Sequence, residues 1–324
     1  MKVIDQSVSL LSQEPGAIGM YKLMETCGRV CWKSEDKITE DSWKKFIKFL
    51  YNRGHWAVFN LGTVYLKVPV VSWTRDKLDI LQNDTKYSPW VWMKKDFSGE
   101  NVFITTNFRV LCQLEITDWV DKYWMNPSNN SHQLRVCVKW VCSRVIAQEV
   151  LRHKVLAPIM ESTRYVNYSH ESKGGNIKFI IPQYAYQLRD EIAETIDSLT
   201  GESKSWIKNE TGEKLWQSLT VESRWAASRD DMWRDEEKQY MYEVGEEGIA
   251  PEVARGVLGL DLACEFYTVG FLKDFYYEPK EDSPEQAGFF KLRCAPACHR
   301  DLRPLANHLR DLMNNKGYDK IWQI

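Results

Sequence analysis

Hydrophobic positions recur mostly at helical spacing along this chain. One such run lies between residues 40 and 53, and the glycine that follows it, Gly54, suits the left-handed conformation that ends many helices. The apolar side chains of the run follow the i, i+3, i+4, i+7 pattern of an amphipathic helix, at Trp43, Phe46, Ile47 and Leu50. The pattern therefore predicts a helix whose apolar stripe faces a protein core.

The same reasoning divides the rest of the chain into elements. Helices are predicted at residues 14–32, 108–124, 143–153 and 213–245, with Asn107 and Ser143 as N-caps and Pro251 at the first position of a later helix. Strands are predicted at residues 2–10, 61–70 and 134–141. Residues 71–101 read as an irregular, charged surface excursion, residues 187–213 are poorly periodic, and residues 283–286 form a capping box that opens another helix.

Helices outnumber strands in this prediction, and the strands are interspersed among them. That order indicates an α+β (mixed α/β) fold. No internal repeat, low-complexity segment or linker rich in proline and glycine divides the chain. We therefore expect residues 1–324 to form a single domain.

Composition and charge narrow the function classes. The chain has 324 residues, of which 44% are hydrophobic and 27% are charged, and its formal net charge is −2. A charge this close to zero argues against nucleic acid or a membrane surface as a partner, so a phosphate ligand requires a local basic site. The chain contains no apolar run long enough for a membrane span, and its first residues lack the apolar region of a signal peptide. A cytoplasmic location is expected.

The cysteines do not change this view. Eight cysteines in a protein that is not secreted are expected to be reduced thiols. Only Cys294, Cys298 and His299 approach the spacing of metal ligands, and they have no obvious fourth partner. We therefore expect no metal site.

The most informative segment reads RHKVLAPIMESTRYVNYS, from Arg152 to Ser169. It begins at the end of a predicted helix, and Pro158 indicates that its later half is extended or looped. Guanidinium groups bind phosphate through paired hydrogen bonds, and a hydroxyl beside them can orient a polar heterocycle. A solvated basic helix end with a salt-bridged strand is the alternative interpretation of these residues.

The pattern RHK-x7-S in this segment resembles the RHR-x7-S motif of the flavin-dependent thymidylate synthases, the ThyX family, and ESTRY-x-NYS resembles one subgroup of it. Further similar segments occur in the same order as in the family: residues 53–68, 104–111, 251–258 (PEVARGVL) and 289–293 (FFKLR), followed by His299. The sequence departs from the family at Asn60-Leu61, where Glu-His is usual, at Lys154, where arginine is usual, and at Gly259, where proline is common.

This resemblance implies a fold, an activity and partners. The implied fold is a single ThyX-like domain with helices packed on a small mixed sheet, in which the segments at about 71–101, 187–245 and 278–287 are interpreted as insertions. The implied activity is reductive methylation of dUMP to dTMP, with methylenetetrahydrofolate as carbon donor, FAD as cofactor and NADPH or NADH as reductant. The implied assembly is a homotetramer with shared active sites.

The resemblance also implies roles for individual residues. It implies FAD contacts at His55, Arg152, His153 and Lys154. It implies nucleotide contacts at Glu149, Arg152, Met160, Glu161, Ser162, Thr163, Arg164, Arg255 and Arg293. Arg293 and Ser162 are the candidate catalytic residues, and Arg293 is expected to stabilise the N3-ionised pyrimidine and so activate C5.

Structural interpretations of these residues remain open. His55 can act as a helix-end histidine, Glu149 as an intrahelical partner of Arg152, and Arg255 and Arg293 as members of structural ion pairs. Two other functions remain open as well. One is an enzyme on the same scaffold that methylates or hydroxymethylates another pyrimidine nucleotide, and the other is a nucleotide-binding homologue without flavin.

Overall fold

The computed structural model describes residues 2–128, 131–169, 177–181, 221–280 and 287–322. It divides the chain into two compact units, each built from separate stretches of sequence. The larger unit contains Ser7–Val141, Ile146–Ser162 and Cys264–Ile324, and the smaller unit contains Met1–Gln6, Cys142–Val145 and Thr163–Ala263. The chain passes repeatedly from one unit to the other. The expected organisation as a single domain stays a prediction.

The smaller unit is built around one long helix. Its strands β1 (Lys2–Ile4) and β8 (Lys178–Ile180) pair in parallel, and its helices are α9 (Val221–Gly245) and α10 (Pro251–Ala254). Phe179 of β8 stacks on Trp233 of α9 with ring centroids 5.2 Å apart, and both side chains are buried. The proline at the start of α10 confirms the expected helix start.

The larger unit contains two sheets and most of the helices. One sheet has the order β2 (Ser7–Leu11), β6 (Arg135–Ser143), β9 (Ala263–Phe271), β7 (Ala157–Met160). The other has the order β3 (Thr63–Pro69), β5 (Asn101–Asn107), β4 (Trp92–Lys95), with antiparallel pairs. Helices of this unit are α1 (Gly16–Arg29), α2 (Ser42–Asn52), α3 (Ser72–Asn83), α4 (Phe108–Gln113), α5 (Trp119–Tyr123), α6 (Arg144–Leu151), α11 (Leu272–Tyr276), α12 (Phe289–Arg293) and α13 (Leu302–Asn315).

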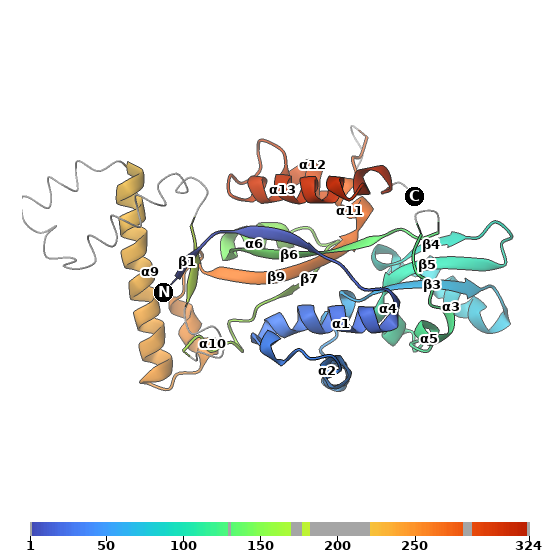
Figure 1. Ribbon diagram of the computed structural model, residues 1–324, viewed down its shortest axis with the longest axis horizontal. Helices are drawn as coiled ribbons and strands as arrows, with labels where there is room; N and C mark the ends of the chain where they lie inside the picture. The colour runs from blue at the N-terminus through green and yellow to red at the C-terminus, as the bar shows by residue number, and fades with distance from the viewer. Residues whose placement is uncertain (1, 129–130, 170–176, 182–220, 281–286, 323–324) are drawn as a thin grey trace, which may run out of the picture. The chain divides into compact units, whose positions relative to one another are not determined.

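Side-chain alternation gives the four-stranded sheet two different faces. On one face, Cys137 of β6 and Tyr267 of β9 pack in a buried cluster with Leu23 and Cys27 of α1. On the other face, Trp140 of β6 stacks on Phe266 of β9 and contacts Phe289 of α12. Figure 1 shows α12 and α13 on one side of this sheet and α1 on the other.

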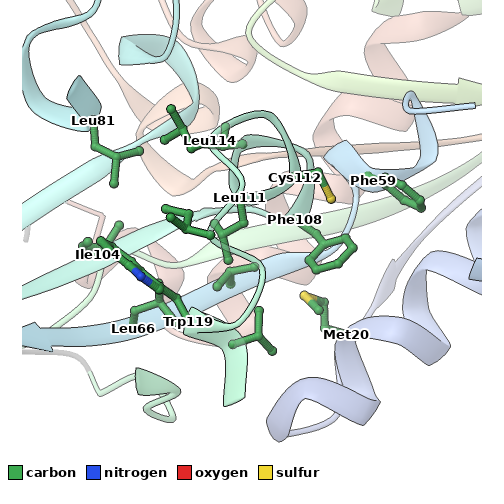
Figure 2. Close-up of a cluster of buried hydrophobic side chains, with 14 of the residues drawn as sticks. Met20, Phe59, Leu66, Leu81, Ile104, Phe108, Leu111, Cys112, Leu114 and Trp119 are labelled. Carbon is green, nitrogen blue, oxygen red and sulfur yellow. The ribbon is translucent and has the colours of Figure 1, made fainter. Parts of the chain in front are cut away.

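The main hydrophobic core of the larger unit surrounds the three-stranded sheet. Met20 of α1, Phe59, and Phe108 and Leu111 of α4 converge with Ile104 of β5 (Figure 2). Most of these side chains are completely buried. Phe59 is part of this core and lies four residues after His55, so its packing positions the segment that carries His55.

Several predicted elements are confirmed. The helix at 40–53 is α2, and Gly54 after it has a φ of 68°. Asn107 caps α4, since its side chain accepts a hydrogen bond from the Val110 backbone N–H at 3.0 Å. The strand at 134–141 and the helix at 143–153 correspond to β6 and α6.

The prediction of an irregular segment at residues 71–101 is wrong. This segment forms α3 and β4, and β4 pairs with β5. The buried side chains of α3, Thr74, Leu78 and Leu81, are few and are separated by charged residues. A sparse stripe of this kind is hard to distinguish from a charged loop, although it suffices for a helix that packs on an existing core.

Two predicted elements are divided in the structure. The strand at 2–10 becomes β1 and β2, because the halves pair with β8 and β6 in different sheets. The helix at 108–124 becomes α4 and α5, separated at Glu115, which has a φ of 58°. The segment 187–213, the start of the helix at 213–245 and the capping box at 283–286 lie outside the described residues.

The α+β class is confirmed, with three small sheets among the described residues where one mixed sheet was expected. In the parts of the chain that the structure describes, no helix is both long enough and apolar enough to cross a membrane. All eight cysteines are free thiols, and six of them are buried.

Candidate active site

Arg293, at the end of α12, is held by residues that lie about 140 positions earlier in the chain. Its Nε donates to His153 Nε2 at 2.9 Å, and its NH1 donates to Glu149 Oε2 at 2.9 Å. Its NH2 donates to the Glu149 backbone carbonyl, also at 2.9 Å. Three of the five N–H groups of the guanidinium are used in this way, and the guanidinium also contacts the Cys298 thiol.

The contact with Arg293 defines the state of His153. A guanidinium can only donate hydrogen bonds, so His153 Nε2 must accept and the proton of the neutral ring must sit on Nδ1. Burial, together with the charges of Arg293 and Arg152, lowers the pKa of His153 to about 4. The ring is 2% exposed and packs on Phe289, with centroids 4.9 Å apart. His153 is therefore a neutral acceptor that orients Arg293.

Glu149 contacts both Arg293 and Arg152, the first residue of the predicted basic segment. Its Oε1 accepts from Arg152 NH1 at 3.2 Å, while its Oε2 belongs to Arg293. The expected intrahelical pair between Glu149 and Arg152 is thus present, but it uses only half of the carboxylate. The Arg152 side chain is 71% exposed, and Lys154 is exposed as well. These two cations are accessible to a ligand.

The state of His153 leads to a prediction about stability and pH. In the unfolded chain, His153 takes up a proton near its usual pKa of 6.5, whereas the folded protein resists protonation down to about pH 4. The unfolded state therefore binds more protons in this window, and the free energy of unfolding falls as the pH is lowered from 6.5 to 4. This one group should contribute about 3 kcal/mol to the fall.

Urea unfolding of the protein and of His153→Gln at pH 7, 5.5 and 4 measures this contribution. Glutamine can still accept from Arg293 but does not titrate, so the variant should lose less stability on acidification. An identical pH dependence in both proteins would show that His153 is protonated as easily in the folded state as in the unfolded state.

A second charged group holds the start of the predicted nucleotide loop. Lys33 Nζ lies 3.0 Å from Glu161 Oε2 and 3.1 Å from Glu265 Oε2. Lys139 contacts the other oxygen of Glu265 at 2.5 Å. Burial alone would lower the pKa of Lys33, but the two carboxylates raise it above its usual range. The side chain of Glu161 is thus paired with Lys33, and its Oε2 also accepts from the Glu265 N–H at 3.4 Å.

Backbone bonds complete the anchoring of this segment. Met160 ends β7 opposite Phe266, the Glu161 N–H donates to the Glu265 carbonyl at 2.9 Å, and the Ser162 N–H donates to the Cys31 carbonyl at 3.3 Å. Ser162 itself is half-buried. The segment from Met160 to Ser162 is therefore held both by backbone hydrogen bonds and by the ion pair of Glu161.

The remaining loop residues belong to the smaller unit. Arg255 NH1 donates to Thr163 Oγ1 at 3.3 Å. Arg164 Nε donates to Glu252 Oε2 at 2.6 Å, and its guanidinium lies 5.4 Å from the centre of the Tyr165 ring. The predicted PEVAR segment and the predicted STR segment are therefore in contact with each other. Arg164 and Arg255 are both exposed.

His55 lies among aromatic rings. Its ring centroid is 5.8 Å from Trp32 and 6.4 Å from Phe49. In the described parts of the chain, no hydrogen bond or ring contact joins His55 to Arg152, His153 or Lys154. The expected contact of His55 with FAD stays a prediction.

Two departures from the family pattern have structural explanations. Leu61 is completely buried in the cluster against α1, a place where a histidine would need a hydrogen-bond partner. The Gly259 N–H donates to Glu236 Oε2 at 2.8 Å, and a proline at this position would have no N–H. A Cβ on Gly259 would also lie 2.8 Å from Glu236 Oε1.

Sequence reasoning did not assign Lys33, Glu265 or Glu252 to the site, and it considered Cys298 only as a metal ligand. Glu252 stands inside the PEVAR segment and could have been found as the acidic neighbour of Arg255. Burial raises the pKa of the Cys298 thiol, and the Arg293 guanidinium beside it acts in the opposite direction. His299 is exposed, and its Nδ1 accepts from the Asp301 N–H at 3.2 Å at the start of α13. That contact gives His299 a structural role at the helix start.

The chain is similar to known proteins in both sequence and structure. The model of the family described as thymidylate synthase complementing protein matches residues 132–316, which contain Glu149, His153 and Arg293. A crystal structure of the UMP/dUMP methylase PolB from Streptomyces cacaoi bound with 5-Br dUMP aligns with all of this chain and 97% of that chain, at 11% identity and a TM-score of 0.38. No curated protein sequence matches the chain.

Proposed function

Since the chain belongs to the thymidylate synthase complementing protein family, we propose that it is an FAD-dependent thymidylate synthase that converts dUMP to dTMP. Methylenetetrahydrofolate is the proposed carbon donor and NADPH or NADH the proposed reductant. The observation that carries this proposal is the contact of Arg293 with His153 and Glu149, which joins the RHK segment to the FFKLR segment. The proposed enzyme is a cytoplasmic homotetramer.

The residues present fit a flavin dinucleotide. Arg152 and Lys154 are exposed cations that can bind its pyrophosphate, and His55 with Trp32 offers ring surfaces for a planar group. Bound FAD would supply the hydride that completes the methyl group. His153 cannot serve as a further cation at neutral pH, because burial and the adjacent guanidinium groups keep it neutral.

The proposed roles of the remaining residues divide between phosphate and base. Arg164 and Arg255 are exposed and can pair with the nucleotide phosphate, and Ser162 can donate to the nucleotide or accept from it. Arg293 is only 15% exposed, so its charge acts in a partly desolvated environment. A fixed cation there stabilises negative charge that develops on the pyrimidine ring, and Glu149 and His153 keep it in place.

Two measurements test this function. The purified protein should be yellow, with flavin absorbance that persists through gel filtration, and its gene should rescue a strain that requires thymidine. A colourless protein that does not take up added FAD would favour a nucleotide-binding homologue. A flavoprotein that fails to rescue, but methylates or hydroxymethylates another pyrimidine nucleotide, would identify a different substrate or product.

The loop prediction compares two substitutions. Ser162→Ala should weaken dUMP binding about fivefold, and Arg164→Ala at least tenfold, because a hydrogen bond from a charged donor is stronger than a neutral one. Glu252→Gln should bind dUMP at least as tightly as the parent protein, since it releases Arg164 from its ion pair. Arg75→Ala, at an exposed cation on α3, is the control. Isothermal titration with dUMP measures all four, and unchanged affinity in both loop variants would remove the loop from the site.

A further inference from the structure

Arg135, the first residue of β6, carries a buried cation without a carboxylate partner. The residue is 7% exposed, and no acidic side chain within the described residues lies at ion-pair distance from it. Its NH2 donates to the Asn60 carbonyl at 2.9 Å, and its NH1 makes only 3.4 Å contacts with Thr63 Oγ1 and the Thr106 carbonyl. Its Nε has no acceptor.

An arrangement of this kind is costly. Buried charges in proteins are normally paired with an opposite charge, because hydrogen bonds to neutral groups replace only part of the lost hydration. Burial lowers the pKa of Arg135 to about 10, so the guanidinium is still charged at neutral pH. Tyr65 and Asp274 act against this lowering of the Arg135 pKa. Burial raises the pKa of Asp274 itself to about 6, and its carboxylate accepts from the Phe271 N–H.

Arg135 forms part of the wall of a cavity of about 360 Å³ inside the larger unit. Much of the remaining wall is apolar and comes from the end of β2, the start of β6 and the segment after α5, including Leu10, Leu11, Trp124, Pro127 and Val136. A volume of a few hundred Å³ with apolar walls and a few polar groups is typical of small-molecule sites. None of its lining residues is among the proposed nucleotide or flavin contacts.

The polar groups at this cavity favour a negative ligand. The Gln13 amide makes two hydrogen bonds with the Thr63 backbone, which fix its orientation, and it carries no charge. Lys316 is exposed at the cavity, and it forms no ion pair within the described parts of the chain. Glu14 is the one carboxylate among the lining residues and is exposed to solvent. Two cations thus face one solvated anion.

We propose that this cavity binds a small organic anion, whose charged group lies toward Arg135 and Lys316 and whose apolar body packs on Leu10, Leu11 and Val136. The bound anion would supply the counter-charge that the protein itself does not place beside Arg135. In a partly desolvated cavity, that attraction is stronger than in water. The site is independent of the proposed thymidylate synthase reaction.

Benzoate serves as the probe, and benzamide as its neutral counterpart of the same shape. Ligand-observed NMR with the full chain should detect benzoate binding, with an affinity at least tenfold higher than that of benzamide. Lys316→Ala should weaken benzoate binding several-fold. Ser12→Trp, which adds a large side chain at an exposed lining position, should abolish it. Lys320→Ala, an exposed lysine outside the cavity, should leave it unchanged.

Other outcomes would overturn the proposal. Equal binding of benzoate and benzamide would show an apolar cavity without charge selection. Binding that survives Ser12→Trp, or that dUMP displaces, would place benzoate elsewhere. No binding at millimolar concentrations would leave Arg135 with only its neutral protein partners, the Asn60 and Thr106 carbonyls, the Thr63 hydroxyl and the Phe271 ring. Because Ser12 and Lys316 are exposed, these variants are expected to fold even if Arg135→Met does not.

Discussion

Arg293→Ala should form almost no thymidylate while still binding FAD normally and dUMP moderately. We expect the rate of the chemical step to fall by about 10²–10³, the usual cost of removing one donor that faces developing negative charge. Single-turnover oxidation of the reduced flavin, measured with nucleotide and folate present, separates this step from binding.

The reason for this split lies in the surroundings of Arg293. Before substrate binds, the Arg293 guanidinium is already hydrogen-bonded to Glu149 and His153. The substrate therefore gains most from this cation when negative charge develops on the pyrimidine ring. Interactions that strengthen only in the transition state lower kcat more than they weaken ground-state binding when they are lost. Arg293→Lys should restore activity only in part, because an ammonium group cannot contact His153 and Glu149 simultaneously in the same planar geometry.

Lys291→Ala is the matched control for Arg293→Ala. Lys291 lies on the same short helix, and its ion pair with Glu278 is exposed and spans 3.6 Å. Lys291→Ala should therefore have no effect on flavin oxidation. If Arg293→Ala also reacts at nearly the parent rate, Arg293 is a structural ion-pair residue and the activating role belongs elsewhere.

The sequence was most informative where the chemistry is local. The segment from Arg152 to Ser169 could be recognised because its charged groups are close together in the chain. The structure confirms the helix before it, and it contains the short strand β7 where an extended or looped segment was expected. Arg293 could be proposed only through resemblance. Its contacts with Glu149 and His153 join positions about 140 residues apart, and no periodic pattern records such a separation.

The parts that could not be predicted share a physical cause. The group of Lys33, Lys139, Glu161 and Glu265 forms only when three strands and the end of α1 are packed together. Each of these residues in isolation reads as an ordinary surface charge. The same holds for Arg135, which looks like the polar start of a strand until the packing of β3, β5 and β6 buries it. Burial of a charge is a property of the assembled core and not of its neighbours in sequence.

Lys33→Met should strongly destabilise the larger unit. Glu161 and Glu265 are 5% and 20% exposed, and Lys33 is the shared partner of both. Removing one member of a buried ion pair leaves an uncompensated charge, which typically costs about 3 kcal/mol or more. Lys139 remains beside Glu265, so the uncompensated charge falls mainly on Glu161.

This loss should be specific in two ways. Lys33→Met combined with Glu161→Gln should recover much of the stability, because the double variant buries no unpaired carboxylate at that position. Lys44→Met, which breaks an exposed pair with Asp41, should not change the urea midpoint. Methionine keeps a side chain at position 33, where the backbone has a φ of 45°, so the comparison does not add the effect of a glycine at a left-handed position.

The pH dependence of Lys33→Met provides a further check. In the parent protein, Lys33 and Lys139 outweigh burial and lower the pKa of Glu265, so this carboxylate contributes stability that is present at neutral pH and lost as the pH falls through its folded-state pKa. Without Lys33, Glu265 should bind protons more readily in the folded state, and the cost of the substitution should therefore shrink on acidification. Urea unfolding of the two proteins at pH 7 and pH 4.5 measures this change. A cost that is small at pH 7, or that does not depend on pH, would show that the ion pairs of Lys33 do not stabilise this loop and that the backbone bonds to Cys31 and Glu265 hold it.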